Sequence, residues 1–183
     1  MNKNVELIGG TEHREIILVP YSESWPESYM HEQAKIQHAL GSRALRIEHI
    51  GSTSIEGLTA KPIIDILLIV EDCDNEDSYL PMLLDEGYVL RVREPGHRMV
   101  RTPDLGVQIH IGSSDADWAR RHILFRDYLR SNPTDKKAYE TLKQKLATQE
   151  WETMNHYADA KGPLIQEITG RAEVWAQLVD WTM

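Results

Sequence analysis

The sequence contains very little cysteine and no long apolar segment. Cys73 is the single cysteine among the 183 residues, which excludes an internal disulfide and a multi-cysteine zinc site. It lies in an acidic stretch that would raise the pKa of its thiol, so we expect no reactive nucleophile there. No apolar run reaches the roughly 18 residues of a membrane span, and the first residues lack the apolar core of a signal peptide. We therefore expect a cytoplasmic protein with no membrane partner.

Positive charge is also scarce. Lysine and arginine number 20 against 29 aspartates and glutamates, which gives a formal net charge of −9. An acidic surface repels the phosphate backbone of nucleic acids, so we do not expect a dedicated nucleic-acid binder. Between residues 120 and 145, however, there are eight basic residues against three acidic ones. This local concentration suits a small polyanionic ligand better than a long nucleic acid.

Apolar periodicity predicts an α+β fold. We expect one domain of residues 12–183, with a mixed sheet in 12–113 and helices in 114–183, preceded by a flexible arm of residues 1–11. The nearly continuous apolar run of residues 62–70 predicts a strand that is buried on both faces. Other strands are expected at residues 15–19, 43–50, 88–93, 97–102 and 107–111, and helices at 24–40, 78–86 and from Asp115 onward, with breaks at Asn132-Pro133 and Gly162-Pro163.

The most informative stretch is the turn Gly51-Ser52-Thr53 and the polar residues that follow it. Small residues let backbone N–H groups approach an anion, and hydroxyls add further donors. Asp65 then lies within an apolar strand, where a carboxylate is costly unless it is paired, bound to a metal or facing a cleft. Lys61 could neutralise a phosphate or Asp65 itself. The alternative is structural, with a tight turn and a hydrogen-bond acceptor at a strand end.

These residues, in their order along the chain, resemble the GrpB family. The resemblance rests on Glu-His-Ile-Gly-Ser-Thr-Ser at residues 48–54 and Lys-Pro-Ile-Ile-Asp-Ile at residues 61–66. The family is similar in fold to polymerase-β-type nucleotidyltransferases, in which a Gly-Ser turn holds phosphates and strand carboxylates bind Mg²⁺. Some relatives are fused to dephospho-coenzyme A kinase, which implies a connection to nucleotides or coenzyme A. The resemblance covers residues 16–170 and includes Val19-Pro20-Tyr21, Trp25-Pro26, residues 108–111 and 125–130, Pro133, Tyr139, Leu142, Lys143 and Lys161.

The resemblance implies roles for individual residues. Gly51 and Ser52, followed by Thr53, take the position of the phosphate turn. Asp65 takes the position of a strand carboxylate that binds metal. A further carboxylate of the superfamily comes from a later strand, and the matching residue here is His110.

The pattern departs from that of active nucleotidyltransferases, which carry two carboxylates two residues apart. The positions that flank Asp65 at this spacing are Ile63 and Leu67. Asp65 alone cannot supply the oxygen ligands that two Mg²⁺ ions require. A site for one metal ion could be completed by Glu48, His49 and His110, and imidazoles favour Zn²⁺, Mn²⁺ or Fe²⁺ over Mg²⁺.

Strand alternation separates several of these candidates. Glu48 and His49 are neighbours, so they point to opposite faces of a regular strand, whereas Gln108 and His110 share a face. His110 is therefore a candidate site residue, with a solvated histidine as the alternative. His122 lies on a helix face, where we expect a half-buried structural histidine.

Basic residues of the helical part are candidates for binding an anion. Arg126 and Arg130 lie four residues apart on one helix face and could clamp phosphates or a carboxylate. The alternative is that they pair with the protein's own acidic residues. Lys143 matches the family pattern and is a further candidate.

Together these patterns favour binding of a nucleotide or another phosphate-bearing small molecule with a divalent metal (Mg²⁺, Mn²⁺ or Zn²⁺). If the site is catalytic, we expect transfer of a nucleotidyl or phosphoryl group, with Asp65 and Lys61 as catalytic residues. Two alternatives stay open: a non-catalytic module that binds a nucleotide or coenzyme A, and an interaction protein with a degenerate site. The sequence indicates no oligomeric state.

Overall fold

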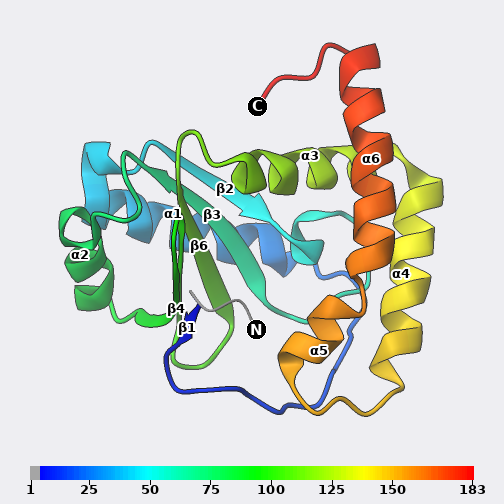
Figure 1. The fold of residues 1–183 in the computed structure, drawn as a ribbon, viewed down its shortest axis with the longest axis horizontal. Coiled ribbons are helices and arrows are strands. Elements are labelled where there is room, and N and C mark those ends of the chain that lie inside the picture. The colour runs from blue at the N-terminus through cyan, green and yellow to red at the C-terminus, as the bar shows by residue number, and fades with distance from the viewer. Residues whose placement is uncertain (1–4) are drawn as a thin grey trace.

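The computed structural model describes residues 5–183, and its strands form one mixed sheet (Figure 1). The strands are β1 (Glu6–Leu7), β2 (Arg46–Ile50), β3 (Ile64–Val70), β4 (Val89–Glu94), β5 (His97–Arg101) and β6 (Val107–Ser113). Their order across the sheet is β1-β4-β5-β6-β3-β2. Strands β3 and β6 run parallel, and the other neighbouring pairs are antiparallel.

Helices cover both faces of this sheet, which confirms the α+β class. They are α1 (Ser24–Leu40), α2 (Leu80–Asp85), α3 (Asp117–Ser131), α4 (Pro133–Ala147), α5 (Met154–Asp159) and α6 (Gly162–Leu178). Helices α1 and α2 pack on one face, and α3 packs on the other. In Figure 1, α4, α5 and α6 lie together at one side of the molecule. Buried side chains of α3, α4 and α6 form an apolar cluster there.

Strand β3 is at the centre of the fold because both of its faces are covered. Ile66 and Leu68 pack in the core with α1 and α2, whereas Leu67 and Ile69 pack on α3. This confirms the strand that the apolar run predicts. Asp65 is half-buried, and alternation places its side chain on the same face as Leu67 and Ile69. The carboxylate therefore points toward the side of α3.

Two segments near the N-terminus differ from the expectations. Residues 15–19 form no strand, and Val19 alone makes an isolated bridge. Pro20 follows directly, and its missing N–H prevents the ladder from continuing. Part of the expected flexible arm is instead strand β1, which pairs with the edge of β4. Residues 1–4 of that arm lie outside the described residues.

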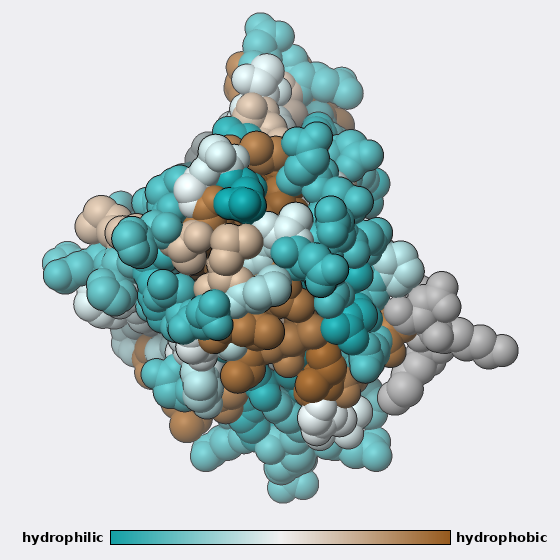
Figure 2. All heavy atoms as spheres, turned by 90° about the vertical axis from the view of Figure 1, so that its left-hand side faces the viewer, coloured by the Kyte–Doolittle hydropathy of each residue, from teal (hydrophilic) through white to brown (hydrophobic). Residues whose placement is uncertain are grey.

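The surface combines a hydrophilic majority with some exposed apolar side chains. Figure 2 shows one side of the molecule, where hydrophilic residues border a hydrophobic area. Val174, Leu178 and Val179 are exposed at the C-terminal end of α6, which projects from the molecule in Figure 1. Among residues 5–183, the structure contains no helix with the length and apolarity to span a bilayer.

Candidate functional site

A cavity of about 590 Å³ lies between the α3 side of the sheet and the helices around it. The neighbouring strands β3 and β6 contribute Asp65 and His110, and the turn after β2 contributes Gly51 and Ser52. The cavity thus collects residues that are far apart in the sequence. Its other walls include Lys61, Gln108, Trp118, Arg121, His122, Phe125, Tyr139, Lys143, Tyr157, Lys161 and Gln166.

Gly51 brings the backbone of the turn against Asp65. Its φ of 69° lies in the left-handed region, where glycine is strongly favoured. A Cβ at this position would be 3.0 Å from Cγ of Asp65 and closer still to Oδ2. A side chain at position 51 would therefore displace the carboxylate. The two residues, which were predicted to share one site, lie side by side.

The hydroxyl of Thr53 is engaged in the protein interior. It donates to the carbonyl oxygen of Ile63 at 3.0 Å and lies 3.0 Å from Nε2 of His49. The His49 ring is buried and stacks on Tyr29 with their centroids 4.8 Å apart, and burial lowers the pKa of His49 to about 4. Thr53 lines the cavity with its hydroxyl already engaged, whereas the His49 ring lies against Tyr29 of α1 and not beside Asp65.

Ser52 and Lys143 join the turn to helix α4. Nζ of Lys143 donates to Oγ of Ser52 at 3.0 Å and also to the carbonyl oxygen of Thr59. The side chain of Lys143 is buried, and burial together with the nearby Lys161 lowers its pKa to about 7. Both residues were expected in the site, and they are in direct contact at its wall.

Lys61 and Lys161 both lie near the ring of Tyr157. Their Nζ atoms lie 5.3 and 4.7 Å from its centroid. Burial lowers the pKa of both lysines, that of Lys161 to about 8. Within the described part of the chain, the only lysine that forms an ion pair is Lys137, which contacts Glu140 outside the cavity. The three lysines of the cavity form none with the described residues. The lysines of the cavity therefore contribute positive charge that is offset by Asp65 only in part.

Asp65 and His110 meet because β3 and β6 are parallel neighbours. The register pairs Asp65 with Gln108 and Leu67 with His110, so these side chains share the face of α3. Nε2 of His110 is 3.7 Å from Oδ1 of Asp65. The prediction that His110 belongs with Asp65 agrees with this geometry.

Glu48 does not join this pair. Its carboxylate accepts a hydrogen bond from Nη1 of Arg126 at 2.8 Å. Of the four expected metal ligands, Asp65 and His110 come together, whereas Glu48 and His49 do not. Among residues 5–183, no group of three or more His, Cys, Asp or Glu side chains is placed to hold a metal ion. The residues present therefore do not fit the two-ion arrangement of the nucleotidyltransferases.

Arg126 and Arg130 are engaged by the protein itself. Arg126 is buried and donates to Glu48 and, at 2.7 Å, to Asp127. Arg130 donates to the carbonyl oxygen of Ser54 at 2.7 Å. These bonds attach α3 to the end of β2 and to the turn. These contacts match the alternative of internal pairing, and of the two arginines Arg126 also lines the cavity.

Three aromatic residues of the cavity had no expected role in it. His122 was expected to be a half-buried structural histidine, but it is exposed, and it lines the cavity together with Trp118. Tyr157 lies on α5, whose six residues are too few to give an apolar period. No pattern in the sequence could have assigned Tyr157 to the site.

Comparison with known proteins gives the family. The family model described as GrpB protein matches residues 15–171. The chain belongs to the GrpB family. A UPF0157 protein of Streptomyces coelicolor is 48% identical over 168 residues, which cover 92% of this chain and 90% of the relative. A dephospho-CoA kinase of Mycobacterium bovis is 28% identical over an alignment of 194 residues in length. The alignment covers 90% of this GrpB chain and 47% of the kinase.

Solved structures agree with the family and the fold. The crystal structure of the conserved protein GrpB from Enterococcus faecalis has a TM-score of 0.76 and 33% identity, and the match covers 87% of this chain and 99% of that one. The Cid1 poly(U) polymerase with Mg 3′-dATP bound has a TM-score of 0.52 and 12% identity, with 70% and 43% covered. At this low identity the likeness shows the fold, which is of the nucleotidyltransferase type.

Proposed function

We propose that this GrpB protein binds a phosphate-bearing small molecule of the nucleotide or coenzyme A class in the cavity. The observation that carries the proposal is the convergence of Lys61, Lys143 and Lys161 on a cavity with a single carboxylate, Asp65. Ammonium groups interact more strongly with phosphate where burial lowers the effective dielectric constant. The nucleotidyltransferase-type fold and the kinase relative support this class of ligand.

The proposed complex divides the ligand between two kinds of surface. The phosphates lie against the lysines and the turn at Gly51-Ser52, where backbone N–H groups add donors. The organic part packs on the aromatic walls of Trp118, Phe125 and Tyr139. Lys61 and Asp65, which were expected to be catalytic, act here in binding and in placing the ligand.

The proposal includes at most one divalent ion. Asp65 and His110 would each supply one ligand, and phosphate oxygens of the bound molecule would supply others, as is usual for Mg²⁺. Transfer by the two-ion route is not part of the proposal, because it requires more oxygen ligands than Asp65 provides. We therefore favour a binding module over a nucleotidyltransferase.

Thermal unfolding with added pyrophosphate, ADP or coenzyme A tests the proposal. A ligand at 100 times its Kd adds about 2.7 kcal/mol of stability, and for a chain of this size each kcal/mol raises Tm by about 2–4 °C. We expect an increase in Tm for at least one of these probes with the wild type and with the control Lys137→Met. The increase should be lost in Lys161→Met. A folded wild type that responds to none of the three probes would contradict the proposal.

The same experiment tests whether a single divalent ion takes part in ligand binding. If one divalent ion bridges Asp65 and the phosphates, Mg²⁺, Mn²⁺ or Zn²⁺ should enlarge the increase in Tm, and EDTA should remove the enlargement. Asp65→Asn should abolish the metal effect while keeping the response to the ligand alone. An unchanged metal effect in Asp65→Asn would exclude Asp65 as a ligand of the ion.

A further inference from the structure

A row of polar side chains leads from Asp65 through His110 to the β4–β5 turn. Nδ1 of His110 is 3.2 Å from Nε2 of His97, and Nδ1 of His97 is 2.7 Å from Oε1 of Glu94. The two imidazole rings are nearly parallel, with an interplanar angle of 10°. Glu94, His97, His110 and Asp65 therefore form a continuous row that ends in the cavity.

The hydrogen bonds of this row determine where each proton lies. The Glu94 carboxylate can only accept, so Nδ1 of His97 carries the proton of that bond. At a pH above the ordinary histidine pKa of about 6.5 the ring carries one proton, so Nε2 of His97 is left as an acceptor. Nδ1 of His110 must then donate to His97. It follows that Nε2 of His110 has a free lone pair on the side of Asp65.

The distance between His110 and Asp65 agrees with this assignment. Nε2 and Oδ1 are 3.7 Å apart, which is longer than the 2.7–3.2 Å of an N–H···O hydrogen bond. Two acceptors with no proton between them keep such a separation. If Nε2 carried the proton, the pair could form a charge-assisted bond at a shorter distance.

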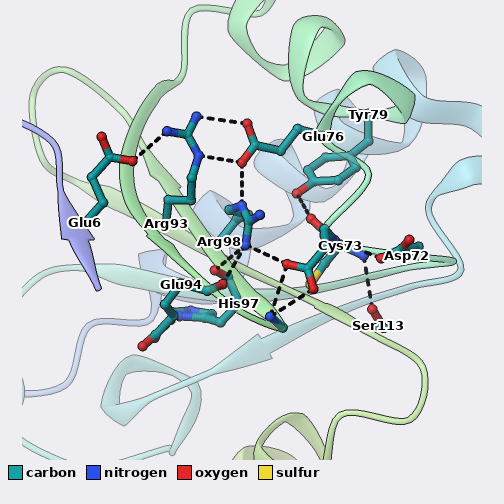
Figure 3. Close-up of polar contacts among 12 residues, drawn as sticks. Glu6, Asp72, Cys73, Glu76, Tyr79, Arg93, Glu94, His97, Arg98 and Ser113 are labelled. Atoms are coloured by element: carbon teal, nitrogen blue, oxygen red, sulfur yellow. Dashed lines mark hydrogen bonds and ion pairs between the residues drawn. The ribbon is translucent and has the colours of Figure 1, made fainter. Parts of the chain in front are cut away.

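The turn that carries Glu94 and His97 is fixed by contacts outside the row (Figure 3). Arg98 donates to the carbonyl oxygen of Glu94 at 2.6 Å and to Asp74 at 2.9 Å. The carboxylate of Asp74 also accepts from the backbone N–H of Gly96 at 3.1 Å. These contacts fix the backbone of the turn that carries Glu94 and His97. Arg98 and Asp74, which make them, do not line the cavity.

We propose that Glu94 and His97 are positioning residues that hold His110 in the tautomer protonated at Nδ1, so that its Nε2 faces Asp65 and the cavity as an acceptor. The inference concerns the same site as the proposed function but does not depend on a bound ligand. It assigns a role to two residues that lie outside the cavity lining.

Nitrogen-15 NMR of histidine-labelled protein reads the protonation of each ring nitrogen directly. At about pH 8, above the ordinary histidine pKa of about 6.5, we expect Nδ1 of His110 to show the chemical shift of a protonated nitrogen and Nε2 that of an unprotonated one. In His97→Phe, which keeps an aromatic ring beside Trp118, both nitrogens should move toward averaged shifts. The control His38→Phe, at an exposed position of α1, should leave the His110 signals unchanged.

Glu94→Gln provides a second variant in case His97→Phe does not fold. A Gln side chain can donate as well as accept, so His97 is no longer forced to carry its proton at Nδ1. The shift of Nε2 of His110 should therefore move. A proton on Nε2 of His110 in the wild type, or unchanged His110 shifts in the folded variants, would overturn the inference. Because these spectra are recorded without a ligand, such a result would leave the proposed function standing, and a failure of phosphate binding would leave the tautomer standing.

Discussion

At the scale of single residues, the contact between Gly51 and Asp65 limits what the site can tolerate. The backbone of Gly51 adopts φ = 69° and lies where any side chain would meet the carboxylate. The sequence identified both residues, through the small-residue turn, the carboxylate in an apolar strand and the family resemblance, but their contact depends on a backbone angle that a pattern of residue types does not reveal. Position 51 therefore combines a conformational requirement with a steric one.

Gly51→Ala tests the two requirements together, and Gly57→Ala separates them. Gly57 has a similar φ of 74°, but the nearest atom to an added Cβ is Nζ of Lys136 at 3.9 Å. We expect each variant to lose about 1–3 kcal/mol of stability in urea denaturation because of the strained backbone. Only Gly51→Ala should also lose the increase in Tm on ligand addition. Equal ligand responses in the two variants would show that the contact with Asp65 does not matter for binding.

The lowered lysine pKa values predict that anion binding weakens as the pH rises. Lys143 and Lys161 have pKa values of about 7 and about 8 in the folded protein, both below the ordinary value for lysine. Between these values the cavity loses positive charge, so affinity should be high at low pH and fall as the pH rises. Calorimetric titration with sulfate, whose charge is constant over this range, measures the effect.

The variant Lys143→Met is the control for this pH dependence. It removes one of the two titrating charges, so its affinity should be lower at acidic pH and should change less between pH values of about 6 and 9. A wild-type affinity for sulfate that does not depend on pH in this range would contradict the lowered pKa values.

At the scale of elements, the length of each segment decided how well the sequence predicted it. The apolar run of β3 is long and uniform, so its burial on both faces follows directly from the residues. Residues 15–19 have a similar apolar character but end at Pro20 and pair at one position only. Helix α5 lies in a stretch that was predicted to be helical, but the break between the end of α4 at Ala147 and the start of α5 at Met154 was not predicted. This short helix carries Tyr157, whose ring is close to two lysines.

The N-cap of α5 offers a test of its role. The side chain of Thr153 accepts a hydrogen bond from the backbone N–H of His156 at 3.2 Å. Thr153→Ala should cost about 0.5–2 kcal/mol of stability and lower ligand affinity, because Tyr157 loses its fixed position near Lys61 and Lys161. Thr141→Ala, on the exposed side of α4, is the matched control and should leave affinity unchanged. Unaltered binding in Thr153→Ala would remove α5 from the proposed site.

At the scale of the whole molecule, the sheet and the helices depend on each other. Ala119 and Ile123 of α3 pack on Leu67 and Ile69 of β3, and Arg126 binds the edge strand through Glu48. The two halves were predicted from periodicity, but the cavity between them was not. Its position depends on how α4, α5 and α6 are arranged, which is a matter of tertiary packing and leaves no periodic signal in the chain.

This mutual packing predicts a single cooperative unfolding transition. If the helical part separated first, the α3 face of β3 would be exposed to water. We therefore expect urea curves from tryptophan fluorescence and from far-UV circular dichroism to coincide, with equal calorimetric and van't Hoff enthalpies. Two resolved transitions would show instead that the sheet and the helices unfold as separate units.

The parallel pairing of β3 with β6 has a consequence for the order of events during folding. Ile64 pairs with Val107, and the chain between them contains α2 and the β4–β5 hairpin. Contacts between residues so distant in sequence form slowly, because the intervening loop must be closed at an entropic cost. Asp65 and His110 meet only through this pairing. Ligand binding is therefore a marker of complete folding. A collapsed chain in which β3 and β6 are not yet paired lacks the binding site.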